Sequence, residues 1–486
     1  MSVITGENKK NRKRKDPLWG SGVQTMSFLE LQPTQDTLIN SLINDSIGRT
    51  KDIVRFSHYI NDLDTSFSIA IDSGWGSGKT FFIKQTKLVL DAYNDYGIQT
   101  ISEEERTNIR NCVSRIKLTG NQSSEFEPQV CVYYDAWAND NDSDPLLSLV
   151  YEILKSVHAD FSFKEGKNIF EISAAIIEFF TGKSANDLIA AFRSSSPFDG
   201  ITAQRNLHEL INEFLSELLK ERGNRLVVFV DELDRCKPDY AVRLLERVKH
   251  YFSNDHIVFV FSINCDALQH TIRRYYGDDF DATRYLDRFF DITMELPPYD
   301  ENLFFNSIGL YDTSYIFDHF RKNIVRRYHL SMREMIRYYK ITSIIAHNYT
   351  HTFGRGFAED NAYTISLLFI LPVAVILRMT DRDAYSAFIS GKNSNPILEA
   401  ADLEIGRSVG GMLLNSEETF DVKNPKNMKV VSLTDKIEEV YEALFSNPLS
   451  SRQREVYIGD TCFNRETRDR FLRTLSAMSD EADYSF

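Results

Sequence analysis

One short segment constrains the fold more than any other part of the chain. An apolar run, Phe67–Asp72, leads into a glycine-rich turn that closes on Lys79 and Thr80, and apolar side chains then recur at helical spacing. The segment therefore predicts a strand, a tight loop and a helix in immediate succession. Such a unit is typical of parallel sheets covered by helices, so an α/β fold is expected.

The turn has the chemistry of a phosphate-binding loop. Glycines let the backbone wrap an anion with its N–H groups, and the helix N-terminus adds partial positive charge. Lys79 is placed to reach the β- and γ-phosphates of a nucleotide, and the Thr80 hydroxyl to bind Mg²⁺. Ser73 stands where the GxxxxGK[ST] consensus has its first glycine. The expected nucleotide-binding residues are Gly74, Trp75, Gly76, Ser77, Gly78, Lys79 and Thr80.

A second apolar run, Leu226–Asp231, ends in two adjacent carboxylates. Asp231 would hold Mg²⁺ through water, and Glu232 would orient or deprotonate an attacking water. Phosphoryl transfer needs mainly positioning and charge neutralisation, so this pair completes the minimum set of groups. The two carboxylates favour hydrolysis over transfer to a small acceptor.

Further apolar runs rich in β-branched or aromatic residues alternate with helical patterns. The remaining strand-like runs are Val130–Asp135, Ile257–Asn264 and Ile292–Leu296. Helical periodicity is clearest over Asn206–Lys220 and Pro238–Phe252. This alternation predicts the three-layer α/β/α sandwich of a P-loop NTPase over residues 31–300, with a helical insert at about 155–205.

After Pro297-Pro298 the helical period dominates and strand signals almost vanish. Residues 301–486 are therefore expected to form an all-helical domain, acting as a lid or a partner-binding surface. The most apolar stretch there, Tyr363–Leu377, is shorter than the ~20 residues that a membrane span needs, and Pro372 interrupts it. It is expected to be a buried core helix rather than a membrane span.

The N-terminal tail differs in charge from the rest of the chain. The 486 residues carry a formal net charge of −14, yet residues 1–30 contain a basic run from Lys9 to Lys15. Such a run predicts a disordered, solvated tail, with a weak contact to nucleic acid or a membrane surface as the alternative. The acidic remainder argues against a nucleic-acid motor. Five scattered cysteines without CxxC spacing indicate reduced thiols in a cytoplasmic protein.

Several motifs together resemble those of the KAP family of P-loop NTPases. The family's GxWGSGK[ST] loop is similar to Ser73–Thr80, its fNAW element to Tyr133–Trp137, and its D[DE]LDRCxP motif to Asp231–Pro238. A further family stretch is similar to Tyr285–Pro298, so the resemblance covers roughly residues 35–345. Two residues depart from the family pattern: Ser73 replaces glycine, and Asp135 stands where asparagine is common.

The resemblance implies an ATPase, with ATP and Mg²⁺ as cofactors, that couples nucleotide state to the conformation of a homo-oligomer or of partner proteins. It resembles the soluble bacterial members of the family, which often belong to multi-gene anti-phage defence systems such as Qat. Two alternatives stay open: a nucleotide-dependent switch or scaffold with little turnover, and a nucleic-acid-associated ATPase that uses the basic tail.

Three more catalytic candidates come from analogy with P-loop proteins that have an extra strand between the two motifs. Asn264 would sense the γ-phosphate, or else form a local strand-end turn. Arg288 would act as an arginine finger on a neighbouring subunit's nucleotide, or else be a surface arginine. Arg333 would touch the γ-phosphate from a helix whose start carries the capping-box pair Ser331 and Glu334. With Glu232 and Lys79, these are the expected catalytic residues.

Overall fold

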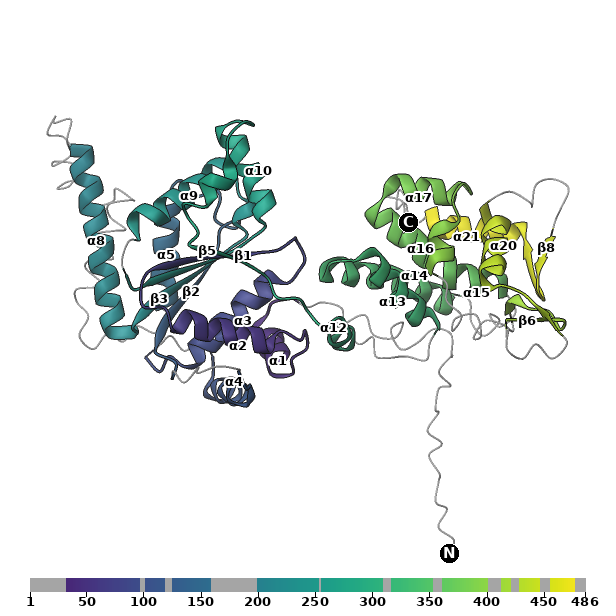
Figure 1. The fold of residues 1–486 in the computed structure, drawn as a ribbon, viewed down its shortest axis with the longest axis horizontal. Coiled ribbons are helices and arrows are strands. Elements are labelled where there is room, and N and C mark those ends of the chain that lie inside the picture. The colour runs from purple at the N-terminus through teal and green to yellow at the C-terminus, as the bar shows by residue number, and fades with distance from the viewer. Residues whose placement is uncertain are drawn as a thin grey trace, which may run out of the picture. The chain divides into compact units, whose positions relative to one another are not determined.

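The structure, a computed structural model, describes residues 32–96, 101–118, 125–158, 199–252, 255–308, 316–352, 361–400, 412–420, 428–445 and 455–476. These residues belong to two compact units, which divide after Phe304 (Figure 1). The basic tail expected at residues 1–30 and most of the insert expected at about 155–205 lie outside the described residues.

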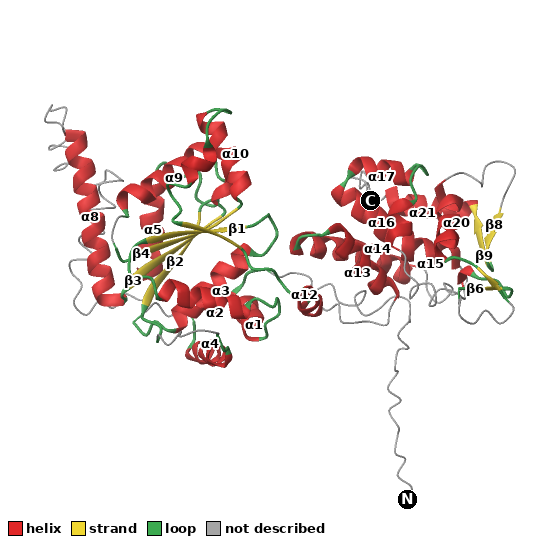
Figure 2. Cartoon of the chain, viewed as in Figure 1, coloured by secondary structure: helices red, strands yellow, loops and turns green. Residues whose placement is uncertain are grey.

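A five-stranded parallel sheet forms the centre of the first unit (Figure 2). Its strands are β1 (Phe67–Asp72), β2 (Gln129–Asp135), β3 (Arg225–Asp231), β4 (Ile257–Ile263) and β5 (Ile292–Glu295). Their spatial order is β2-β3-β4-β1-β5. The expected α/β sandwich is confirmed, and β4 is the extra strand that separates β1 from β3.

The strands contribute side chains to two hydrophobic cores, because successive side chains of a strand point to opposite faces of the sheet. On β3, Val228 and Val230 face a core shared with α5 (Pro145–His158), α8 (Asp199–Arg222), α9 (Pro238–Tyr251), α10 (Cys265–Tyr276) and α11 (Ala282–Leu286). Val227 and Phe229 face the other core, with α1 (Gln35–Ile43), α2 (Thr50–Asn61), α3 (Lys79–Ala92) and α4 (Glu103–Arg115). Burial on both faces explains why β1 to β4 consist of near-continuous apolar runs, whereas the edge strand β5 is exposed.

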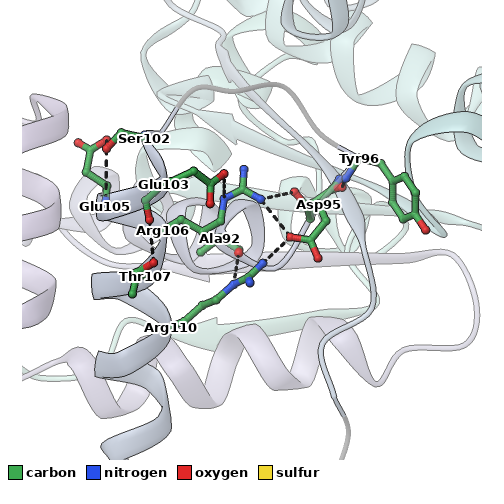
Figure 3. A network of polar contacts seen from close by, with 10 residues as sticks. Ala92, Asp95, Tyr96, Ser102, Glu103, Glu105, Arg106, Thr107 and Arg110 are labelled. Carbon is green, nitrogen blue, oxygen red and sulfur yellow. Dashed lines mark hydrogen bonds and ion pairs between the residues drawn. The ribbon is translucent and has the colours of Figure 1, made fainter. Parts of the chain in front are cut away.

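A network of polar contacts fixes α4 against the end of α3 (Figure 3). Arg106 donates to the Asn94 carbonyl and to the Asp95 carboxylate, each at 3.1 Å. Arg110 donates to the same carboxylate and to the Ala92 carbonyl, each at 2.6 Å. Because α3 begins at the glycine-rich turn, this network holds the far end of the helix that carries Lys79.

The second unit is mainly helical, but the expectation of an all-helical domain is wrong. Its described helices include α13 (Ile316–Tyr328), α14 (Met332–Thr352), α15 (Asn361–Ile365), α16 (Leu371–Thr380), α17 (Arg382–Ile389), α18 (Asn395–Ala400), α20 (Leu433–Phe445) and α21 (Arg465–Ser476). Two small sheets pair β6 (Glu418–Thr419) with β7 (Lys429–Val430), and β8 (Glu455–Ile458) with β9 (Thr461–Asn464). Strands of two to four residues are too short to show a period of two in the sequence. Helix α12 (Glu301–Ser307) spans the boundary between the units.

The apolar stretch of the second unit forms a helix from Asn361 to Thr380, with a π-helical turn at Ser366–Ile370 just before Pro372. Among the described residues, it is the one helix long and apolar enough to cross a membrane by length and composition. However, 89% of its apolar window is buried inside the protein, which is what a core helix shows.

Replacing Arg106 with alanine is expected to lower the free energy of unfolding of the first unit by about 2 kcal/mol, the typical contribution of hydrogen bonds to charged groups. Urea unfolding followed by tryptophan fluorescence measures the change, since Trp75 and Trp137 lie in this unit. Arg115→Ala, at an exposed position of α4, serves as the control and should change stability by less than about 0.5 kcal/mol. Equal losses in the two variants would contradict a specific role for the network.

Candidate functional site

The two sequence motifs meet at the carboxyl edge of the parallel sheet. Asp72 ends β1 and Asp231 ends β3, and their partners in the β4 register are the adjacent residues Ile263 and Ser262. The turn after β1 and the turn after β3 are therefore separated by one strand only. Ligands of open α/β sheets bind at this edge.

The glycine-rich turn has the backbone that wrapping an anion requires. Gly76 and Gly78 have φ angles of 79° and 91°, which L side chains rarely adopt. Gly78 is the N-cap residue of α3, so the first helical N–H groups follow it directly. The amide of Ser73, where the consensus has glycine, donates to the Ile263 carbonyl at 3.2 Å and thus extends the pairing of β1 with β4.

Lys79 is buried, with 8% of its surface exposed. Its Nζ donates to the carbonyls of Ser73 and Gly74, at 2.5 and 3.1 Å, inside the turn. Burial lowers the pKa of the amino group, and the charges of Asp234, then Asp231, offset only part of this effect. A partly desolvated ammonium group that donates to backbone carbonyls of its own loop fits a site that takes anionic phosphate oxygens.

Asp231 is 2% exposed, and its carboxylate accepts three hydrogen bonds. The hydroxyls of Thr80 and Tyr133 donate to its Oδ2, at 2.7 and 3.0 Å, and the Glu232 amide donates to its Oδ1 at 3.0 Å. A hydroxyl beside a carboxylate is a donor set that suits Mg²⁺, which prefers oxygen ligands. Thr80 and Asp231 thus lie together, as the sequence predicts.

Tyr133, the first residue of the element similar to fNAW, was not predicted from the sequence as a site residue. It lies on β2, paired with Phe229 of β3, and the Lys84 ammonium lies 4.1 Å from the centroid of its ring. Burial, followed by the charge of Asp231, raises the pKa of the Tyr133 phenol, which therefore stays a proton donor to this carboxylate. Burial also lowers the pKa of Lys84.

A second unpredicted residue, Arg49, supports the glycine-rich turn from outside the motif. It is 6% exposed, and its Nη1 donates to the Ser77 carbonyl at 2.9 Å. Its guanidinium lies 5.8 Å from the centroid of the Tyr299 ring. Burial lowers the pKa of Arg49 to about 10. Sequence periodicity gives no signal for this contact, because Arg49 precedes β1 and belongs to no motif.

The turn after β3 holds its acidic residues by specific contacts. Glu232 forms an ion pair with Arg235, whose guanidinium lies 5.6 Å from the ring centroid of Trp137. Asp234 accepts a hydrogen bond from the indole Nε1 of Trp75 at 2.6 Å. The side chain of Trp75 therefore links the glycine-rich turn to the acidic turn.

The three candidates taken by analogy lie at different places. Asn264 follows β4 at the carboxyl edge, where its side chain accepts from the Ala267 amide at 3.1 Å and caps α10. Arg288 is exposed in the segment before β5. Arg333 belongs to the second unit, where it is exposed at the start of α14, next to the capping box of Ser331 and Glu334. Their catalytic roles stay predictions.

Three features define a P-loop NTPase domain. The sheet is parallel with the strand order β2-β3-β4-β1-β5, the glycine-rich loop after β1 closes on Lys79 and Thr80, and Asp231 stands at the end of β3. This fold binds nucleoside triphosphates, usually with Mg²⁺. The chain belongs to the KAP family: the KAP family P-loop domain matches residues 49–308, more than half of its length.

Other similarities are weaker. A segment of 51 residues is 41% identical to an uncharacterized protein of Methanocaldococcus jannaschii, and the match covers 10% of this chain and 26% of that protein. The solved structure of the Aeropyrum pernix ORC2 protein is 12% identical, with 94% of this chain and 98% of that chain covered and a TM-score of 0.32. A structure of Drosophila ORC bound to DNA is 11% identical, with 98% and 96% covered and a TM-score of 0.30. Scores this low carry no argument about function.

Tyr133→Phe is expected to weaken the apparent Mg²⁺ affinity of the nucleotide complex about tenfold, because groups that orient a metal-holding carboxylate typically contribute that much. Titration of a fluorescent nucleotide at several Mg²⁺ concentrations measures the effect. Binding in excess chelator should not change, and Tyr151→Phe, on the exposed face of α5, is the control. An unchanged Mg²⁺ dependence would show that the phenol hydroxyl does not support Asp231.

Proposed function

We propose that this chain is an ATPase that hydrolyses ATP with Mg²⁺ at the carboxyl edge of the sheet and transmits its nucleotide state to an assembly. The observation that carries the proposal is the hydrogen bond of 2.7 Å between Thr80 and Asp231. It brings together the two groups that would hold Mg²⁺, and Glu232 follows directly on the chain.

The binding roles follow from the geometry of the turn. The backbone N–H groups of residues 74–80, at the start of α3, would take the phosphates, and Lys79 would exchange the carbonyls of Ser73 and Gly74 for phosphate oxygens. Thr80 and Asp231 would hold Mg²⁺, which supplies charge neutralisation between the phosphates. Adenine as the base is proposed from the family resemblance alone.

Glu232 is the proposed general base. A carboxylate beside the metal-holding group can orient a water molecule and accept its proton as the water oxygen attacks the γ-phosphorus and the bond to the leaving ADP oxygen breaks. In the structure Glu232 is paired with Arg235, so its carboxylate already has a fixed orientation.

Arg288 is the proposed arginine finger, acting on a neighbouring copy. Asp291, three residues after Arg288, exchanges hydrogen bonds with Ser68 at the amino end of β1: its amide donates at 2.9 Å, and its carboxylate accepts at 2.8 Å. The glycine-rich turn follows the other end of β1, where Asp72 lies four residues from Ser68, about 13 Å away at ~3.3 Å each. The exposure of Arg288 and its place before the residues that pair with the amino end of β1 support a role on another chain rather than on its own.

The proposed biological setting is a cytoplasmic, multi-gene anti-phage defence system in which the chain works with partner proteins. Family membership, together with the resemblance to its soluble bacterial members, supports this role. Loss of phage protection on Lys79→Ala substitution, in cells that carry the neighbouring genes, would test it. Protection that survives this substitution would count against the role.

Glu232→Gln is expected to lower kcat for phosphate release by about 10²–10⁴-fold while ATP still binds, because a general base contributes that much. Lys79→Ala should instead weaken ATP binding. Phosphate release and equilibrium binding of a labelled nucleotide separate the two effects. If Glu232→Gln protein releases phosphate as the wild type does, the alternative of a nucleotide-dependent switch with little turnover is favoured.

Mixing Arg288→Ala protein with Lys79→Ala protein is expected to restore part of the ATPase activity. Each mixed interface can join an intact phosphate site to an intact arginine, and an arginine in trans typically contributes ~10³–10⁵-fold in rate. Activity measured against mixing ratio and total concentration gives the readout. Activity that follows each chain's own defect, without rescue or concentration dependence, would exclude a trans role.

A further inference from the structure

The turn that carries Glu232 is tied to the glycine-rich turn by a bond that phosphate binding itself does not need. The indole N–H of Trp75 donates to Asp234 at 2.6 Å. Asp234 is 6% exposed, so its carboxylate would be costly to bury without a partner. The ring of Trp75 is 55% exposed, hence core packing does not explain a tryptophan at this position.

Glu232 has a backbone conformation that needs support. Its φ angle is 60°, in the left-handed region, which is uncommon for residues other than glycine. The turn closes through the amides of Arg235 and Cys236, which donate to the carbonyls of Glu232 and Leu233 at 3.1 and 3.2 Å. A conformation of this kind persists only where surrounding contacts determine it.

Arg235 fixes the carboxylate of Glu232 from within the same turn. Both side chains are mostly buried, with 23% and 19% of their surfaces exposed, and they form an ion pair. The guanidinium also lies over the ring of Trp137, itself 53% exposed, at 5.6 Å. An arginine held by a carboxylate on one side and an aromatic face on the other has little freedom to leave.

The segment that carries Trp137 is anchored to the same turn. Asp135 accepts a hydrogen bond from the Ala138 amide at 2.9 Å, which shapes the segment just after β2. Asp140 accepts from the Lys237 amide at 3.2 Å, which joins the segment to the residue before α9. The ring below Arg235 is therefore part of a connected frame rather than a loose surface side chain.

We infer that Trp75 and Arg235 are positioning residues for Glu232: the first holds the acidic turn against the glycine-rich turn through Asp234, and the second orients the Glu232 carboxylate. The inference rests on the proposed function. In this role Trp75 aligns the general base, Glu232, with the phosphates that the glycine-rich turn would hold.

Trp75→Phe keeps an aromatic ring but removes the N–H that Asp234 accepts. We expect kcat to fall roughly tenfold, as for loss of a hydrogen bond to a charged group, with KM and nucleotide affinity within about threefold of wild type. Hydrogen–deuterium exchange should also speed up in the turn, at the amides of Arg235 and Cys236. Unchanged exchange there would overturn the link between the two turns.

Arg235→Gln is expected to lower kcat with little change in KM, and Arg235→Lys to restore part of the loss, because an ammonium group can re-form the ion pair. The matched control is Arg243→Gln on α9, which breaks a surface ion pair with Asp239 and should leave kcat and exchange in the turn unchanged. Rescue by lysine separates a positioning role from a loss of folding.

Two results would overturn the inference while leaving the proposed function intact. The first is a wild-type kcat in both the Trp75→Phe and the Arg235→Gln proteins. The second is a rise in kcat in the Arg235→Gln protein, which would show that Arg235 restrains Glu232 instead of positioning it for catalysis. If instead wild-type and Glu232→Gln proteins are equally slow, the proposed function fails. The exchange measurement then still decides whether Trp75 holds the turn, since it requires no turnover.

Discussion

The candidate site of the first unit is built around one hydrogen bond, between the Thr80 hydroxyl and the Asp231 carboxylate, which joins residues 151 positions apart in the chain. The bond can form only if β1 and β3 run parallel, end at the same edge and have a single strand between them. The two cores on either face of the sheet hold that order, and the contacts at the end of α3 hold the helix that carries Thr80. The fold thus serves to bring two short turns together.

Much of this arrangement could be predicted from the sequence. Strands β1 to β4 consist of near-continuous apolar runs because helices cover both faces of the sheet there, whereas β5 is exposed; all five were predicted to within a residue or so at each end. The binding residues of the site could also be predicted, because phosphate binding and Mg²⁺ binding require fixed residue types at fixed spacing around Lys79 and Asp231. Strand β4 was predicted from its apolar run, and it lies between β1 and β3, where the P-loop class used for the analogy has an extra strand.

The rest depends on which segments become neighbours in space. Tyr133 contacts Asp231 only because β2 lies beside β3, and Arg49 reaches Ser77 from a helix start that no motif marks. Trp75 was predicted as a nucleotide-binding residue, but nothing in its spacing indicates a bond to Asp234. The short strands β6 to β9 were missed because pairing with a neighbour, not periodicity, defines them.

The place of Arg288 before β5 has a consequence for how copies of the chain can associate. Arg288 precedes the residues that pair with the amino end of β1, and the glycine-rich turn follows its carboxyl end, so a contact that joined them between two copies would use two different surface regions. A two-fold dimer would form this contact twice only if both regions lay on its one self-complementary face, because residue i then meets residue j and j meets i. Where the two regions lie on different faces, the arrangement is head-to-tail, and it either closes into a ring or grows as a filament. In a filament the terminal copy would always have a phosphate site without an arginine, whereas a ring would leave none incomplete.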